Sequence, residues 1–174
     1  AGVLQTLSPK QEQTHADKGL KIKGLFQEIS DLGNKIDDEI DALVKIYRDD
    51  PSKIDNLRIY PERLQSVTAW FAGTSSNPTP RTGQVKPSKW SIRALGTRLQ
   101  YRTQVFRAFS NTPMEQFVED RLDILDDLER IGNDIRNMDN PKKWGELTDQ
   151  HYNGYRGAIK RMLQRWNTLQ TVEE

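Results

Sequence analysis

The sequence predicts an all-α protein: an up-and-down four-helix bundle with an N-terminal arm and a long crossover that contains a short extra helix. Apolar residues recur at steps of three and four in four long stretches, which is the spacing of helices with one buried face. Prolines stand at the expected starts and ends of these stretches. Of the 174 residues, 34% are apolar and 29% are charged, which suits amphipathic helices better than buried strands. We expect a mobile arm over residues 1–17 and a single domain over residues 18–174.

The first long helix is predicted from Lys18 to Asp50, because Pro51 disfavours a helical conformation in the residue before it. Its apolar stripe is Leu25, Ile29, Leu32, Ile36, Ile40, Leu43 and Tyr47. Residues 51–88 form the crossover, with a short helix that begins at Pro61. The face of this short helix is Leu64, Val67, Trp70 and Phe71.

Three more helices are predicted in the second half of the chain, joined by connections so short that neighbours must be antiparallel. The first covers residues 89–109 after Ser88 as a cap, with Arg102 filling one step of a stripe of Ile92, Leu95, Leu99, Phe106 and Phe109. The second covers residues 113–138 after a capping box of Thr112 and Glu115. The third covers residues 141–169, with Trp144, Leu147, His151, Tyr155 and Trp166 on its inner stripe.

Charge is divided unevenly between these predicted helices. Residues 81–109 hold seven basic residues and no acidic one, whereas residues 113–138 hold eight acidic residues and three basic ones. One interpretation is attraction between adjacent antiparallel helices, which would cover at least partly the arginines of the basic helix, Arg93, Arg98, Arg102 and Arg107. The other is docking of the basic set on an acidic partner. The candidate partner-binding residues are those where the loop enters the helix: Arg81, Lys86, Lys89 and Arg93.

The residue types needed for catalysis or for metal and cofactor binding are few. There is no Cys, and the two histidines, His15 and His151, are far apart, so thiol chemistry is absent and a zinc site is not expected. The di-iron ExxH pattern and a phosphate-binding glycine loop are both missing. We predict no catalytic, cofactor or metal site and no transmembrane segment. A nucleic-acid partner is not expected, because the sequence pI of about 8.1 is low for that role; a nucleic-acid-binding bundle would need an exposed basic face from Arg93 to Arg107.

From Lys89 onward the order of features resembles PsbQ, the extrinsic four-helix subunit on the lumenal side of photosystem II, and in particular its algal PsbQ-prime relatives. Trp90 followed by LGTRLQYRTQVF at residues 95–106 is similar to the second helix of that family. DRLDILDDLERI at residues 120–131 is similar to the third, and NPKKWGELTDQHYNGYRGAIKRML at residues 140–163 to the fourth. The arm departs from plant members, which carry more prolines there, and residues 51–88 look like either an insertion or a region specific to the algal branch.

This resemblance implies a nonenzymatic subunit in the thylakoid lumen of the chloroplast, without a cofactor of its own, that stabilises the oxygen-evolving complex and helps retain calcium and chloride. Its partners would be the lumenal loops of the photosystem core and other extrinsic subunits. The alternative is a helical adaptor or secreted effector-like bundle unrelated to photosynthesis. The chain begins at Ala1, which we interpret as either a mature terminus left by removal of a targeting peptide or a boundary of another origin.

Overall fold

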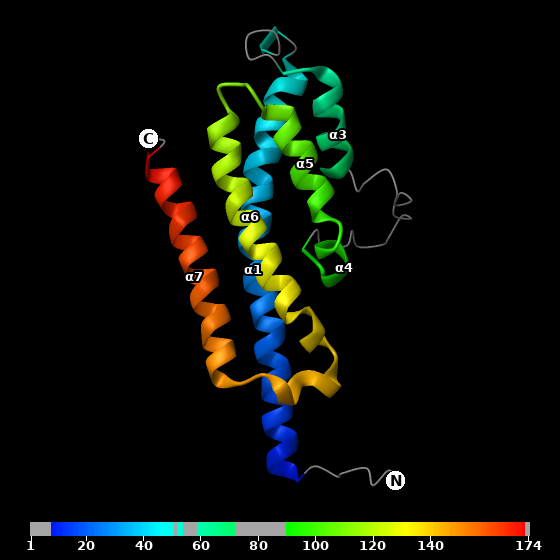
Figure 1. Cartoon of the computed structure of the whole chain (residues 1–174), viewed down its shortest axis with the longest axis vertical. Helices are drawn as coiled ribbons and strands as arrows, with labels where there is room; N and C mark the ends of the chain where they lie inside the picture. Colours follow the sequence, from blue (N-terminus) through cyan, green and yellow to red (C-terminus); the bar gives the residue numbers. More distant parts are fainter. Residues whose placement is uncertain (1–7, 51, 54–58, 72–89, 173–174) are drawn as a thin grey trace.

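The protein is all-helical in the computed structural model, which describes residues 8–50, 52–53, 59–71 and 90–172 (Figure 1). No strand occurs in these ranges. The helices with described bounds are α1 (Pro9–Asp49), α3 (Pro61–Phe71), α4 (Ile92–Leu95), α5 (Arg98–Phe109), α6 (Glu115–Arg136), the short 3-10 helices η1 (Asn137–Asp139) and η2 (Pro141–Glu146), and α7 (Asp149–Val172). The predicted all-α class is therefore confirmed.

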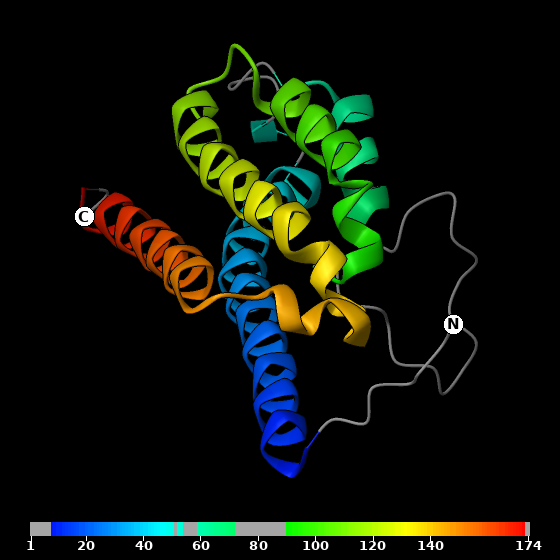
Figure 2. The same cartoon turned by 60° about the horizontal axis from the view of Figure 1, so that its bottom comes forward.

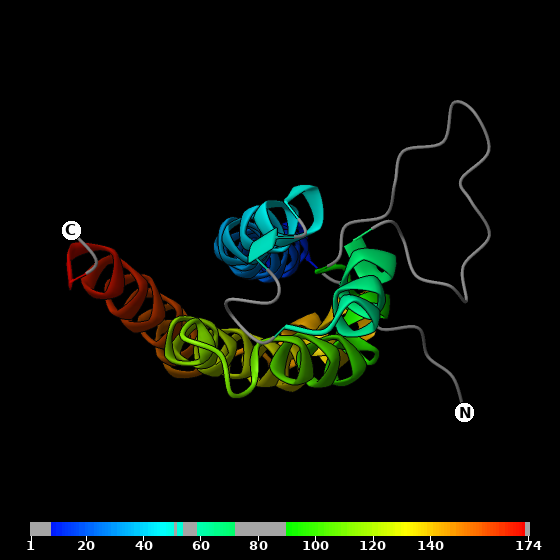
Figure 3. The same cartoon turned by 90° about the horizontal axis from the view of Figure 1, so that it is seen from above.

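The longest helix, α1, is the element around which the others are arranged. Viewed from above, α3, α5, α6 and α7 form an arc and α1 lies inside its curve (Figure 3). Helix α1 packs against α3, α6, α7 and η2, while α5 lies between α3 and α6. Helix α7 stands at the end of the arc, on the side of α6 away from α5 (Figure 2).

Helix α1 begins nine residues earlier than expected. The mobile arm was expected to extend to Asp17, but residues 9–17 are helical and residues 1–7 lie outside the described ranges. The cause is a capping box: the Ser8 hydroxyl accepts from the backbone N–H of Gln11, and the Gln11 side chain accepts from the N–H of Ser8. The helix ends before Pro51, as predicted. Its predicted stripe is buried apart from Leu43, which is half-buried, and the next residue, Val44, is the buried one at this turn.

The predicted helix over residues 89–109 is interrupted. Ser91 caps the short helix α4, which ends at Leu95 with Gly96 as its C-cap, and α5 begins after Thr97. The predicted cap Ser88 lies outside the described residues. The interruption changes the buried face: Leu99 is 64% exposed and Phe106 44% exposed, whereas Tyr101, Val105 and Ala108 are buried. Leu95 and Phe109 of the predicted stripe are buried, as expected, but the prediction was wrong for Leu99 and Phe106 because it continued one helical phase across Gly96.

Helices α3 and α6 agree closely with the prediction. Helix α3 runs from Pro61 to Phe71 and buries Leu64, Val67 and Trp70 against α5 and α1. Helix α6 buries the predicted apolar residues Val118, Leu122, Ile124, Leu125, Leu128, Ile131 and Ile135, while Phe117 and Met138 are half-buried. At its start, Glu115 accepts from the N–H of Asn111, and the Thr112 hydroxyl accepts from the N–H of Met114. The capping interactions are therefore displaced by one residue from the predicted box.

The predicted helix over residues 141–169 is two elements. Asn140 caps η2, which Pro141 begins, and the chain leaves the helical conformation at Leu147. The Thr148 hydroxyl then accepts from the N–H of His151 and begins α7. His151 is consequently exposed in the first turn of α7, and its predicted place on the inner stripe was wrong. Tyr155 and Trp166 are half-buried against the core, as expected of the inner face.

Candidate functional site

Three of the predicted partner-binding residues, Arg81, Lys86 and Lys89, lie outside the described ranges. Arg93 lies on α4, where the backbone is described and the side chain is not. The structure does describe the other arginines of this basic segment. Their interactions decide how much of its positive charge is neutralised inside the molecule.

Arg98 forms a buried ion pair with α1. Its guanidinium donates to Asp37 at 2.9 Å, and the indole N–H of Trp90 donates to the other oxygen of the same carboxylate, also at 2.9 Å. Both charged side chains are at most 1% exposed. The guanidinium stacks over the Trp90 ring at 3.6 Å and lies 4.8 Å from the Tyr101 ring, a favourable arrangement of cation and aromatic face. Burial is the main cause that raises the pKa of the Tyr101 hydroxyl.

Trp90 can occupy this position because the residue of α1 that faces its ring is a glycine, Gly33. A Cβ added at Gly33 would lie 2.2 Å from the indole ring. A second pair repeats the arrangement, since a Cβ at Gly19 would lie 2.6 Å from the ring of Trp144 in η2. Two tryptophans from distant segments thus pack directly against the backbone of α1 at glycine positions. No periodicity in the sequence indicated these two contacts.

Arg102 joins α5 to two carboxylates on successive turns of α6. It donates to Asp126, and its Nε lies 2.9 Å from Oε2 of Glu129. This confirms that the acidic helix covers Arg102. The second contact is not aligned as a hydrogen bond, and Glu129 is only 4% exposed. Desolvation by burial raises the pKa of Glu129 to about 7, against the opposing effect of Arg102.

A further set of polar contacts holds α1, α6 and α7 together. Glu39 accepts from Arg121 at 3.1 Å and from the indole N–H of Trp166. Arg165 of α7 donates to Asp127 of α6 at 2.7 Å. Arg98, Arg102 and Arg165 therefore form ion pairs within the molecule, and so do Asp126, Asp127 and Glu129 of the acidic stretch.

Some cations remain outside these pairs. Arg107 is exposed and has no ion pair to a described residue, and the same holds for Lys160 and Arg161 on the outer face of α7. The sequence interpretation did not single out the two α7 residues, although residues 150–172 contain four basic residues and no acidic one.

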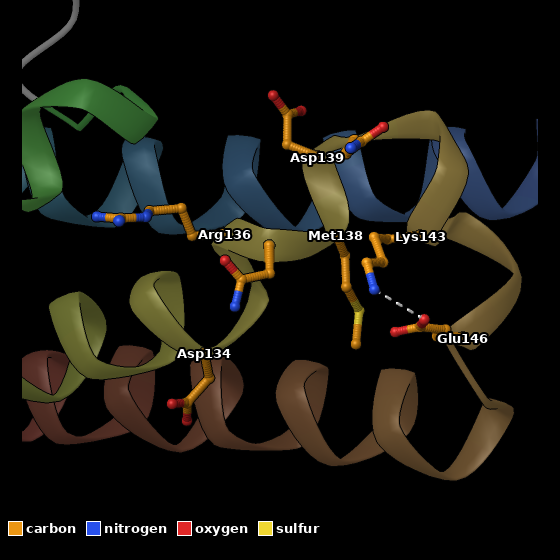
Figure 4. Close-up of a pocket in the computed structure, with 8 residues that line it drawn as sticks. Asp134, Arg136, Met138, Asp139, Lys143 and Glu146 are labelled. Carbon is orange, nitrogen blue, oxygen red and sulfur yellow. Dashed lines mark hydrogen bonds and ion pairs between the residues drawn. The ribbon is translucent and has the colours of Figure 1, made fainter.

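A pocket of about 720 Å³ lies where α6, η1 and η2 meet (Figure 4). Its charged lining residues have both signs, and Lys143 and Glu146, three residues apart on η2, form an ion pair at 3.3 Å on one side of it. Mixed, exposed charges of this kind do not favour one class of ligand. The lining residues are Asp134, Arg136, Asn137, Met138, Asp139, Asn140, Lys143 and Glu146.

Within the described ranges, no three His, Asp or Glu side chains are grouped as a metal site would require. His15 instead stacks on Trp144 with ring centroids 5.1 Å apart. None of the described helices contains an apolar segment long enough to span a membrane. The described residues also include exposed cations without an ion pair to another described residue, Arg107, Lys160 and Arg161, and surface cations of this kind attract acidic groups.

Comparisons with protein-family models, curated proteins and solved structures found no match to this chain. The resemblance to PsbQ consequently depends on the sequence features themselves.

Proposed function

We propose that this chain is a nonenzymatic extrinsic subunit of photosystem II that stabilises the oxygen-evolving complex and helps retain calcium and chloride. The support is the order of features shared with PsbQ, from Trp90 through the acidic run of α6 to the aromatic pair Tyr152 and Tyr155 of α7. In this proposal α1, α5, α6 and α7 are the four helices of an up-and-down bundle, and α3 belongs to the crossover.

The observation that carries the proposal is the internal neutralisation of Arg98 and Arg102. From Arg63 to Met114 the sequence contains no acidic residue. Two arginines of this segment form ion pairs within the molecule, Arg98 with Asp37 and Arg102 with the carboxylates of α6. In this proposal the remaining positive charge of the segment contacts an acidic partner, and the candidates are Arg81, Lys86, Lys89 and Arg93.

The partners in this proposal are the lumenal loops of the photosystem core and the neighbouring extrinsic subunits. The protein would lie in the chloroplast thylakoid lumen, peripheral to the membrane. It would act by covering the manganese–calcium cluster, without contributing a ligand to it.

The test is rebinding to photosystem II particles from which extrinsic subunits have been removed by a salt wash. Arg81→Glu, Lys86→Glu and Lys89→Glu together should weaken rebinding at least about tenfold, mainly through slower association. Helical content and melting temperature should stay close to wild type, because the proposal assigns these three charges to docking and surface charges contribute little to stability.

A matched control makes the same change of net charge elsewhere. Lys10, Lys23 and Lys45 are exposed on α1 and have no ion pair to a described residue. Their replacement by Glu should leave rebinding nearly unchanged. Equal weakening by both triple variants would show dependence on net charge alone, and failure of the wild-type protein to rebind would refute the proposed function.

A second candidate function, a protein-binding adaptor unrelated to photosynthesis, is favoured by Leu99 and Phe106. These large apolar side chains are exposed two turns apart on α5 and are not needed for the core that this helix helps form. Rebinding to the particles distinguishes the candidates, because an unrelated adaptor should not restore oxygen evolution to them.

A further inference from the structure

We propose that Glu129 is a reversible proton-binding site that makes the contact between α5 and α6 sensitive to pH around neutrality. This inference does not depend on the proposed function, because it concerns a group inside the fold. It begins from the charges gathered where α1, α5 and α6 meet.

The charged groups acting on Glu129 come from three helices. Arg98 and Arg102 belong to α5, Asp126 to α6 and Asp37 to α1. With Glu129 itself, three carboxylates face these two guanidinium groups, and Arg130 adds a third cation on the exposed side of Asp126. The charges are therefore balanced in number, and which carboxylate binds a proton depends on how well each one is stabilised where it lies.

The structure identifies which carboxylate takes the proton. Asp37 is held by two donors, Arg98 and the indole of Trp90. Asp126 is 36% exposed and accepts from Arg130 as well as Arg102. Glu129 is 4% exposed, and its Oε2 has no aligned hydrogen bond. Glu129 is thus the least stabilised anion of the three.

The electrostatics agree in direction with this geometry. Burial raises the pKa of Glu129 from 4.5 to about 7, so the folded protein binds the proton more tightly than the unfolded chain. Stability should therefore increase as pH falls from about 7 towards 4.5, below which both states are protonated. Above about pH 7 the buried carboxyl group of Glu129 is ionised, and the contact between α5 and α6 is weaker.

The contact between α5 and α6 matters because α5 packs against α3 on its other side. Helix α3 packs on α5, whereas α6 is tied independently to α7 through Asp127 and Arg165. Weakening the contact between α5 and α6 at high pH should consequently loosen α5 and leave the contact between α6 and α7 unaffected.

The experiment compares the full chain with E129Q, a neutral side chain of nearly the same shape. Carbon-13 NMR should show the Glu129 carboxyl titrating near pH 7. The melting temperatures of the two proteins should agree below about pH 4.5, and at pH 8 wild type should melt about 10 °C lower than E129Q. Amide exchange in α5, corrected for its intrinsic pH dependence, should be faster in wild type only at pH 8.

Asp123→Asn is the matched control. Asp123 also has a raised pKa, mainly from desolvation, but it is exposed on the outer side of α6. This variant should keep the pH dependence of wild type. A Glu129 carboxyl that titrates below about pH 5, or parallel melting curves for wild type and E129Q across this range, would overturn the proposal.

Discussion

At the scale of single residues, the contact of Trp90 with Gly33 determines whether the buried ion pair can form. The indole ring needs the space that a side chain at position 33 would occupy. The same ring donates to Asp37 and stacks on Arg98. The absence of a side chain at Gly33 therefore permits a hydrogen bond, a cation–aromatic contact and an ion pair together.

Gly33→Ala should lower the free energy of unfolding by about 3 kcal/mol or more, because the Cβ would displace Trp90 and leave Asp37 with one donor fewer. Gly24→Ala is the matched control on the same helix, where a Cβ would meet no atom within 4 Å. It should raise the free energy of unfolding by about 0.5–1 kcal/mol through helix propensity. Urea unfolding measures both; equal effects of the two substitutions would contradict the packing described here.

At the scale of elements, the first two turns of α1 are unusual in having little packed against them. Residues 9–17 are exposed except for His15, which is half-buried against Trp144. Their helical conformation comes from the Ser8 capping box and from continuity with the rest of α1.

Removal of residues 1–16 should accordingly cost less than about 2 kcal/mol, mostly from the lost ring contact of His15. Circular dichroism should show a small loss of helix, and thermal unfolding should show the modest change in stability. His15→Ala in the full chain separates the two causes, since it removes the ring and keeps the helix. A large loss on truncation would mean that this part of α1 is packed more firmly than its exposure indicates.

The elements also show what the sequence can and cannot predict. Periodicity located α3 and the apolar core of α6, where one helical phase continues without interruption. It failed at Gly96 and at Leu147, because short breaks shift the phase and the pattern on either side still looks continuous.

The charged cluster was only partly predictable for a different reason. Opposite charges on neighbouring helices were enough to predict that α6 covers Arg102. The pairing of Arg98 with Asp37 joins residues 61 positions apart, and an aspartate beside a helical stripe normally faces solvent. Nothing in the local pattern marks Asp37 as buried, and the docking residues Arg81, Lys86 and Lys89 remain a prediction.

At the scale of the whole molecule, charge is nearly balanced in total and separated in space. The net charge is +1, yet the segment from Arg63 to Met114 has no acidic residue and α6 is strongly acidic. Long-range attraction to a partner must therefore come from local asymmetry, which acts over short distances in salt solution.

Rebinding of wild-type protein to salt-washed photosystem II particles should consequently be much weaker in about 1 M than in about 0.01 M salt, since the screening length falls from about 30 to about 3 Å. Equilibrium binding at several salt concentrations would measure this dependence. Binding that is insensitive to salt would instead point to an apolar contact, for which Leu99 and Phe106 are the exposed candidates.

The two glycines below tryptophans also limit how α1 can vary in length. Gly19 and Gly33 are fourteen residues apart, about 21 Å along a helix and about 40° short of four full turns, so both face nearly the same side. Inserting or deleting one residue between them would rotate one glycine by about 100° relative to the other, and either Trp90 or Trp144 would then meet a side chain. This segment should accept substitutions at its exposed positions and reject changes in length, which the chain can accommodate only in its connections.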